Sequence, residues 1–298
     1  MTTRSEKAAV EPPALLYEMM RSFAVLAQTL NLSHAVQQLG STRQTVRRHI
    51  SQLEDSMAVK LFDVQDRRYH LTEAGQRALP SAQSMLAQGA VWLNGQYDHV
   101  NGMERLTYED DNGWIFHQQQ QPLSRVWEGE SDLLKAAARG WAAAGGELEN
   151  PAMKPVRPYI LVFRDSPGGW ICVELGEETL YAKWYGWANA RSSIGRALDQ
   201  FPGGEEFARL TNVPFQEVQA GQGIRLDQVL TKMPRDAGGP LHYIGFYRLM
   251  LGMRLPDGSP AIVAAVDRAD RLRITDVDPT LIEKMPRDAT VTFDRSRL

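Results

Sequence analysis

The sequence predicts an α+β protein: a helical module with a β-hairpin, then a long helix, then a larger domain of mixed helices and strands. Three observations predict this order. Apolar residues recur at three- and four-residue steps between residues 15 and 53, the spacing of amphipathic helices. Two short β-like runs follow at 59–71, and strand-like and helix-like segments alternate beyond residue 130. The 298 residues are enough for two hydrophobic cores.

The composition is that of a soluble globular protein, with 43% hydrophobic and 23% charged residues. No window approaches 18 uncharged apolar residues, so no membrane span is predicted. Residues 1–14 lack the apolar segment of a secretory signal and are predicted to be a disordered lead-in. The single cysteine, Cys172, excludes an internal disulfide and fits a cytoplasmic location.

The net charge of −3 hides an asymmetry along the chain. Residues 15–90 hold 8 Lys and Arg against 6 Asp and Glu, a balance of +2. That balance is too small to indicate DNA binding by itself. The placement of the basic groups is more informative about DNA binding than their number, because phosphate contacts need these groups on one face.

Three helices are expected in the N-terminal module. The first is expected from about Leu15 to Leu30. Ser33 is expected to cap a short second helix over 34–39, which ends at Gly40 because glycine readily takes the left-handed backbone conformation. Thr42 is expected to cap the third.

The third helix carries the candidate DNA contacts. Val46, Ile50 and Leu53 share one face, which is expected to be buried. The polar residues lie on or beside the opposite side, where arginine can bind a guanine edge and glutamine an adenine edge. A tight turn followed by such a helix is the layout of a helix-turn-helix whose second helix enters the major groove. The candidate contacts are Thr42, Arg43, Gln44, Thr45, Arg47, Arg48 and Ser51.

A hairpin wing is predicted after this helix. The β-like runs at 59–64 and 69–71 flank a polar turn. Arg67 and Arg68 lie at or beside the tip of this turn, where they are expected to contact phosphate or the minor groove.

This block resembles the LysR-type family of bacterial transcriptional regulators, from about Ser22 to Leu86. The resemblance implies a winged helix-turn-helix that binds double-stranded DNA. Four positions depart from the family pattern: Arg43 and Arg47 replace its usual glutamine and serine, Ala58 its glycine and Val64 its arginine. The family's base contacts therefore cannot be copied onto this chain. The residues that carry the resemblance are Ala35, Leu39, Val46, Arg48, Ile50, Leu53, Glu54, Val59, Leu61, Phe62, Leu71, Thr72, Glu73, Ala74 and Gly75.

A linker helix is predicted from a cap at Thr72 to about Asn94. Leu79, Ala82, Leu86, Gly89 and Leu93 fall on a rough heptad seam, which favours pairing with a second copy in a homodimer. A dimer would bring two recognition helices to two half-sites on DNA. The alternative is a helix that packs on its own domain.

The remaining two-thirds of the chain lacks the pair of α/β lobes that usually follows in the LysR-type family. Helices are expected at 131–144, 192–199, 205–210 and 226–232, and strands at 159–163, 170–175, 243–255 and 261–266. This order resembles a PAS-type sensor fold, carried by 193–198, by Phe201 and Pro202, and by the turn at Asp257 and Gly258. A different α+β sensor domain stays open.

An aromatic cluster is the candidate ligand site of this domain. Trp184, Trp187 and Tyr247 are expected to line a pocket for a small molecule, although core packing is the commoner use of such residues. Six histidines and one cysteine show no metal-binding spacing. Glycine-rich phosphate loops and nucleophile–base arrangements are also absent from the sequence. No metal, cofactor or enzymatic activity is therefore predicted.

These observations favour a dimeric, sequence-specific transcriptional regulator controlled by a small-molecule effector. Residues 1–14 are the lead-in, 15–71 the DNA-binding domain, 72–100 the linker helix and 101–298 the sensor or assembly domain. Two alternatives stay open: a C-terminal domain that only oligomerises or binds a protein partner, and a DNA-binding enzyme. The operator, the effector, the direction of regulation and the pairing of dimers into tetramers are not predicted.

Overall fold

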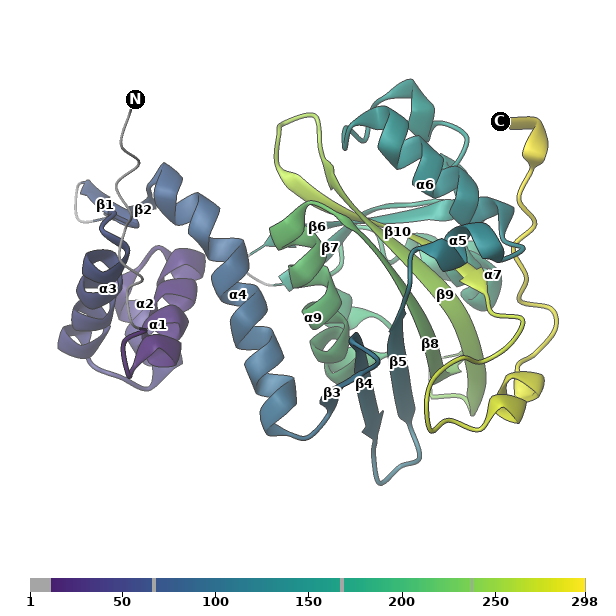
Figure 1. Ribbon diagram of the computed structural model, residues 1–298, viewed down its shortest axis with the longest axis horizontal. Coiled ribbons are helices and arrows are strands. Elements are labelled where there is room, and N and C mark those ends of the chain that lie inside the picture. Colours follow the sequence, from purple (N-terminus) through teal and green to yellow (C-terminus); the bar gives the residue numbers. More distant parts are fainter. Residues whose placement is uncertain (1–11, 66–67, 167–168, 237, 298) are drawn as a thin grey trace, which may run out of the picture. The chain divides into compact units, whose positions relative to one another are not determined.

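A computed structural model of the chain divides into two compact units, one ending at Leu86 and the other beginning at Ala87. It describes residues 12–65, 68–166, 169–236 and 238–297. Figure 1 labels the helices and strands of both units.

The first unit is a three-helix module with a two-stranded wing. Its elements are α1 (Leu16–Thr29), α2 (Leu32–Leu39), α3 (Arg43–Met57), β1 (Phe62–Gln65), β2 (Arg68–Leu71) and the first part of α4 (Glu73–Leu93). The structure confirms the predicted helices and hairpin. It corrects the cap of α2, because the Asn31 side chain, and not Ser33, accepts hydrogen bonds from the backbone at that helix start.

The start of the wing is the structural junction of this unit. The buried Glu54 carboxylate of α3 accepts hydrogen bonds from the backbone nitrogens of Leu61, at 2.9 Å, and of Phe62, at 3.3 Å. Thr72 donates its backbone N–H to the Leu61 carbonyl. A Cβ on Gly75 would lie 2.2 Å from that same carbonyl oxygen, so only glycine fits there. Five of the residues that carry the family resemblance therefore meet at one place: Glu54, Leu61, Phe62, Thr72 and Gly75.

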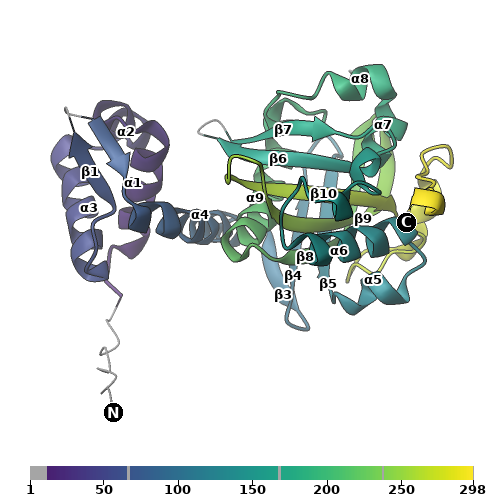
Figure 2. The ribbon, with the colours of Figure 1, turned by 90° about the horizontal axis from the view of Figure 1, so that it is seen from above.

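The second unit is built on one antiparallel sheet of eight strands in the order β3-β4-β5-β8-β9-β10-β6-β7. Figure 2 shows this sheet from above. The strands are β3 (Tyr97–Val100), β4 (Met103–Glu109), β5 (Ile115–Gln121), β6 (Ile160–Ser166), β7 (Gly169–Leu175), β8 (Ile224–Pro234), β9 (Leu241–Arg254) and β10 (Pro260–Arg268).

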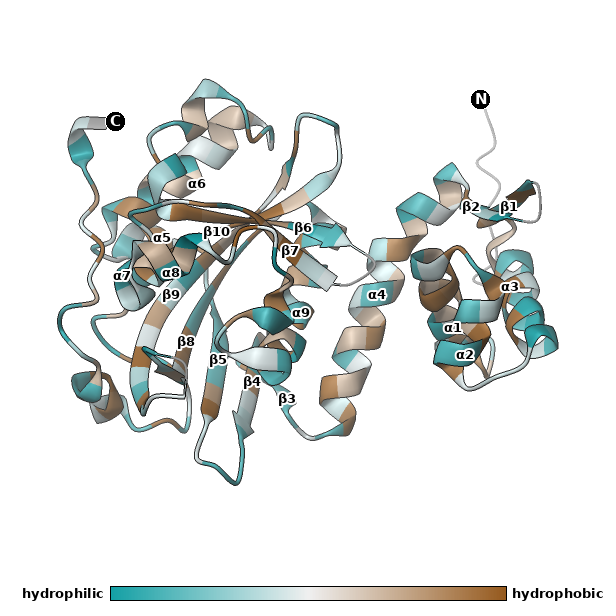
Figure 3. Ribbon diagram, turned by 180° about the vertical axis from the view of Figure 1, so that it is seen from behind, coloured by the Kyte–Doolittle hydropathy of each residue, from teal (hydrophilic) through white to brown (hydrophobic). Residues whose placement is uncertain are grey.

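Helices cover both faces of the sheet. Along β9, Leu249 and Leu251 pack with α6 on one face, while Met250 packs with α9 on the other. The neighbouring strand β10 is apolar on both sides, as its brown colour shows in Figure 3. The helices are α5 (Ser124–Glu128), α6 (Asp132–Ala144), α7 (Leu180–Tyr185), α8 (Trp187–Arg191) and α9 (Gly204–Gly221), with 3-10 turns at Pro151–Met153, Arg157–Tyr159, Leu198–Gln200, Pro279–Lys284 and Arg295–Arg297.

The strands β6 and β7, the helices after them and the hairpin of β9 and β10 follow the element order on which the PAS-type resemblance rests. The strands β3 to β5 add a meander at the β8 edge that was not predicted. Two predicted helices are wrong: 226–232 lies within β8, and 192–199 is mostly turn. In that turn, Gly195 has a φ of +84° and Ala197 pairs with β7. Among the described residues, no helix is long and apolar enough to cross a membrane.

Candidate nucleic-acid interface and ligand cavity

Helix α3 is fixed in the first unit by its cap and its buried face. The Thr42 hydroxyl accepts a hydrogen bond from the Thr45 backbone nitrogen at 3.1 Å. Val46 and Ile50 are buried against α1 and α2, as predicted. His49, which sequence reasoning missed, is also buried and shares a 2.8 Å hydrogen bond with Ser22 of α1. The opposite side of α3 is therefore held outward.

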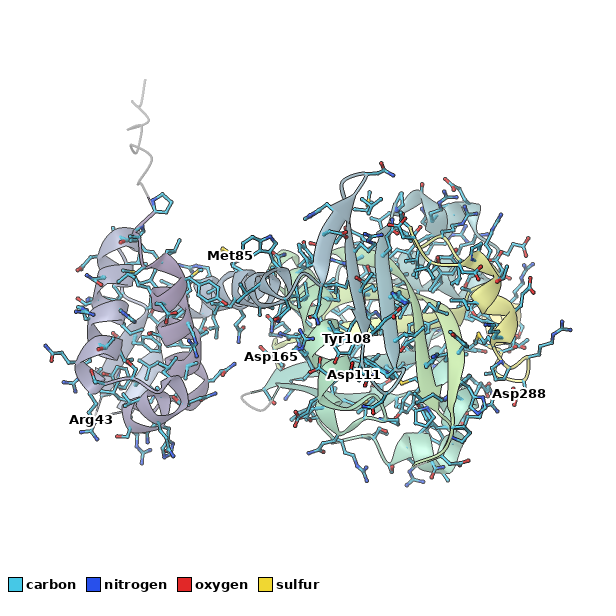
Figure 4. All side chains as sticks on the ribbon, turned by 90° about the horizontal axis from the view of Figure 1, so that it is seen from below. Arg43, Met85, Tyr108, Asp111, Asp165 and Asp288 are labelled. Atoms are coloured by element: carbon cyan, nitrogen blue, oxygen red, sulfur yellow. The ribbon has the colours of Figure 1, made fainter. Side chains whose placement is uncertain are left out.

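That outward side presents three arginines. Arg43 lies at the surface of the first unit (Figure 4) and donates a hydrogen bond to the Ser33 hydroxyl of α2 at 2.8 Å. Arg47 and Arg48 are exposed, and neither guanidinium has a hydrogen-bond or ion-pair partner among the described residues. Two unpaired guanidinium groups one residue apart are free to bind an anionic ligand such as phosphate.

The other predicted contact residues differ in their surroundings. Gln44 and Ser51 are exposed, whereas Thr45 is half-buried. The Thr42 hydroxyl lies 2.9 Å from the Thr45 hydroxyl and is already used in the cap. Gln52 is exposed beside Ser51 and was not singled out from the sequence. Its position one turn beyond Arg48 was the signal that could have identified it.

One of the two arginines predicted to lie at the wing is among the described residues. Arg68 is exposed at the start of β2, opposite Gln65 of β1. Arg67 lies outside the described residues. The exposed basic groups of this unit thus extend from α3 to the base of the hairpin tip.

Comparison with known families identifies this module. Residues 17–76 match the family model described as the bacterial regulatory helix-turn-helix protein, lysR family. The N-terminal module is a lysR-type helix-turn-helix. Helices α1 to α3, the wing and the beginning of α4 all fall within the matched residues.

Each of the similar proteins matches less than a third of the chain. The chain is 33% identical over 67 residues to the uncharacterized HTH-type transcriptional regulator YbhD of Escherichia coli, covering 22% of this chain and 21% of YbhD. It is 35% identical over 92 residues to the HTH-type transcriptional regulator ShiR of Corynebacterium glutamicum, covering 30% and 31%. The chain thus spans less than a third of the length of either relative. A solved structure of OxyR from Corynebacterium glutamicum is 23% identical, with 29% and 27% coverage and a TM-score of 0.27.

Some of the predicted seam residues of helix α4 are packed in a hydrophobic cluster, and others are exposed. Leu79, Ala82 and Leu86 pack into the hydrophobic cluster of the first unit, as the alternative to a dimer seam predicts. Three other apolar side chains of this helix are exposed: Met85 at 49%, Trp92 at 68% and Leu93 at 78%. Exposure of large apolar groups on one helix is typical of an interaction surface.

The second unit has an apolar pocket of about 110 Å³, partly open to solvent, between the sheet and α7 and α9. Its walls are mainly aromatic and aliphatic side chains. Two polar residues also line it: Thr211 of α9, which is 1% exposed, and Arg248 of β9, which is 4% exposed. Among the described residues, neither the Thr211 hydroxyl nor the Nε atom of Arg248 has a hydrogen-bond partner, and both atoms are buried.

The structure does not bring the three predicted ligand residues together. Trp184 lines the cavity, is 3% exposed and donates a hydrogen bond to the Pro234 carbonyl at 3.2 Å. Trp187 is 39% exposed and does not line the cavity. Tyr247 faces the other side of the sheet, where it lines a separate polar pocket with Asp267 and Arg268.

A buried charge cluster adjoins the cavity. It comprises Glu104 of β4, Glu217 of α9, Arg225 and Asp227 of β8, and Arg248. Arg225 contacts all three carboxylates, and Arg248 contacts Asp227 at 3.3 Å. Arg248 also donates a hydrogen bond to the Gln118 side chain at 2.5 Å.

The two glutamates of this cluster share a proton. Burial and the hydrogen bond with Glu104 raise the pKa of Glu217 to about 8. Burial opposes ionisation of Glu104 as well, but hydrogen bonds from Glu217 and Tyr97 and the charge of Arg225 outweigh it and lower the pKa of Glu104. With Glu217 protonated, two arginines face two carboxylates and the cluster is neutral. Among the described residues, no three His, Cys, Asp or Glu side chains form a group that could hold a metal ion.

Proposed function

We propose that the protein is a sequence-specific DNA-binding transcriptional regulator. The observation that carries this proposal is the pair Arg47 and Arg48, exposed and unpaired on the outward side of α3 in a lysR-type helix-turn-helix. The relatives YbhD and ShiR are described as transcriptional regulators. As a regulator of a bacterial type, the protein acts on the chromosome in the cytoplasm, and the proposal assigns it no catalytic step.

In this proposal α3 lies in the major groove. Arg43 and Gln44, in its first turn, reach base edges, and Arg47, Arg48 and Ser51 follow the groove. Thr42 and Thr45 lie closest to the phosphates at the helix N-terminus, where the dipole favours anions. Arg67 and Arg68 contact the backbone from the wing.

The proposed active form is a homodimer paired through α4. The exposed side chains of Met85, Trp92 and Leu93 are the surface for the second copy. A dimer matches DNA with two related half-sites, because each copy supplies one recognition helix.

The second unit is the proposed sensor for a small-molecule effector. Its partly open apolar cavity, lined by a few polar residues, is the form that ligand sites commonly take. Residues 15–71 then bind DNA, 72–100 connect and pair the copies, and 101–298 sense the ligand.

The test is a selection of bound duplexes from a random DNA pool with the full-length chain. The expected result is enrichment of one sequence, with two related half-sites about one helical turn apart. The enriched duplex should retain its binding in excess competitor DNA. Binding without enrichment, lost steeply as salt rises, would contradict sequence-specific recognition.

A further inference from the structure

Five aromatic rings in the wall of the apolar cavity hold one another in place. They come from α7, α9, β6 and the segment before α9. Neighbouring rings in this series have centroids between 4.7 and 6.1 Å apart, a separation at which aromatic pairs stabilise each other. In order of contact, the rings are those of Tyr185, Tyr181, Phe201, Phe163 and Phe215. The wall therefore has a defined shape of its own, so the cavity is expected to discriminate between ligands by size.

The cavity is a space that the side chains around it do not fill. Its volume is about 110 Å³, of the order of an engineered apolar cavity of about 150 Å³ that binds benzene. Protein interiors are otherwise packed as densely as organic crystals, so the side chains around such a space lack contacts on one side. An apolar molecule of matching size supplies those contacts, and it can enter because the cavity is partly open to solvent.

The charges around the cavity disfavour an ionised ligand. Of the described residues that line it, Arg248 is the one that is charged at neutral pH. Its guanidinium contacts the fully buried Asp227 carboxylate at 3.3 Å, so its charge is already balanced. Burial raises the pKa of the phenols of Tyr181 and Tyr185, which therefore stay neutral. A carboxylate or an ammonium group in the cavity would lose its hydration without gaining an unpaired partner of opposite charge.

We infer that the cavity binds a small uncharged aromatic molecule, a single ring with no more than a short alkyl group. The inference rests on the proposed sensing role of the second unit, and it names the class of ligand for that site. Its basis is the combination of aromatic walls, a volume of the order that accepts benzene, and a lining whose charge is already paired. An aromatic ring suits these walls better than an alkane of equal size, because aromatic pairs attract one another beyond their burial.

Four compounds separate the effect of size from that of charge: toluene, benzoate, benzylammonium and naphthalene. The first three share one ring and differ in a methyl, a carboxylate or an aminomethyl cation, whereas naphthalene has two fused rings. Binding to the full-length chain is measured by calorimetry, with tryptophan fluorescence as a second readout because Trp184 lines the cavity. Toluene is expected to bind at least tenfold more tightly than either ion, and more tightly than naphthalene.

Two adjacent alanines of β10 provide a matched pair of variants. Ala264 lines the cavity, whereas Ala265 packs with α6 on the opposite face of the sheet. Ala264→Leu fills part of the cavity and should weaken toluene binding at least tenfold. Ala265→Leu crowds the same strand without entering the cavity and should retain toluene binding.

A variant that enlarges the cavity tests the inference even if Ala264→Leu fails to fold. Phe207 of α9 is half-buried and lines the cavity. Phe207→Ala should raise the affinity for naphthalene relative to toluene at least tenfold, a gain that a misfolded chain cannot produce. Glu205→Gln, an exposed change on the same helix, is the matched control and should bind all four compounds as the parent does.

Tighter binding of any other of the four compounds than of toluene would overturn the inference, as would no binding of toluene or an unchanged toluene affinity in folded Ala264→Leu. DNA selection with the same preparation separates these outcomes from failure of the proposed function. A chain that selects a DNA sequence but does not bind toluene is a regulator without this class of ligand. A chain that binds toluene but selects no DNA sequence keeps the ligand site and loses the proposed regulatory role.

Discussion

The side-chain amide of Gln88 on α4 donates a hydrogen bond to the Glu217 carboxyl on α9, with 2.6 Å between nitrogen and oxygen. Glu217 also contacts Arg225, and Asp227 connects Arg225 to Arg248 at the cavity. An unbroken series of polar contacts thus joins the cavity wall to the last turns of α4. A ligand that moved Arg248 would change the partners of a residue on that helix.

The first prediction concerns the pH dependence of stability. The pKa of Glu217, about 8, lies above the ordinary carboxyl value of 4.5, so the folded chain holds a proton that the unfolded chain releases between these values. The resulting stabilisation is complete below about pH 4.5 and is lost as pH rises through about 8. Since one proton is involved, the free energy of unfolding should fall by up to about 1.4 kcal/mol per pH unit in this range.

Glu217→Gln mimics the protonated carboxyl, so the variant should lose this slope between pH 6 and 8. Its neighbours Glu104, Arg225 and Gln88 are unchanged. The pH dependence of the free energy of unfolding is measured by urea unfolding, followed by tryptophan fluorescence. All seven tryptophans lie beyond Leu86 and therefore report on the second unit. Glu205→Gln should behave as the parent. The same slope in the parent and in Glu217→Gln would show that the shared proton is absent.

The second prediction concerns the unpaired arginines. Arg47→Ala combined with Arg48→Ala should weaken binding to the selected duplex at least tenfold and reduce the slope of affinity against salt. The fold should persist, since neither guanidinium has a hydrogen-bond or ion-pair partner among the described residues. Fluorescence anisotropy at several salt concentrations measures both effects.

A charge-matched control is available on the same unit. Arg21 and Arg77 are exposed and pair with Glu18 and Glu73 on their own helices, so replacing both with alanine removes the same charge elsewhere. An equal loss of affinity in this control would mean that only overall charge matters, and not the position of α3.

The third prediction concerns self-association. Trp92→Arg places a charge on the proposed pairing surface, where Trp92 is 68% exposed. Sedimentation equilibrium should show a dimer for the parent chain and a dissociation constant raised at least tenfold for the variant. Trp127→Arg is the control, because Trp127 is 50% exposed but lies on α5. A dimer unaffected by Trp92→Arg would place the pairing surface elsewhere.

The fourth prediction concerns the ends of two helices in the first unit. Ala58, at the end of α3, has a φ of +55°, and Gly40, at the end of α2, has a φ of +59°. This left-handed conformation is unfavourable for alanine and natural for glycine. Ala58→Gly should therefore stabilise the unit by about 1 kcal/mol, and Gly40→Ala should destabilise it by a similar amount.

Hydrogen exchange of the α3 amides measures both changes in the full-length chain. About 1 kcal/mol corresponds to roughly a fivefold change in protection. Slower exchange in Gly40→Ala, or faster exchange in Ala58→Gly, would contradict the assigned backbone geometry.

The first unit could be predicted from sequence because its signals are local. Apolar spacing, Thr42, Gly40 and the cap at Thr72 lie within or beside the helices they define. Ser33 was given the cap of α2 because both Ser33 and Asn31 are good caps and spacing alone did not separate them. The hydroxyl of Ser33 instead accepts a hydrogen bond from the Arg43 guanidinium.

The second unit could be predicted less well because its strands bury polar residues. Gln118 is 1% exposed in β5, and Asp227 and Gln228 are fully buried in β8. These side chains break the apolar pattern from which strands are predicted, so β5 was not predicted and part of β8 was expected to be a helix. Their burial depends on partners distant in sequence, such as Arg248 for Gln118, which no short window contains.

The ligand cavity illustrates the same limit. Trp184 does line it, but the alternation along β9 turns Tyr247 away and brings Phe246 and Arg248 inward. Strand direction at those positions follows from pairing with β8 and β10. That pairing could have indicated which residues share the cavity face, whereas aromatic content alone could not.

The edge strands of the eight-stranded sheet restrict how copies of the chain can associate. Strand β3, at one margin, spans four residues, and β7, at the other, exchanges hydrogen bonds with the segment at Gly195 and Arg196 through Cys172. A short or covered edge strand has few free backbone groups with which a strand of another chain can pair. The second unit is thereby protected against fibrous aggregation when it accumulates in a crowded cell.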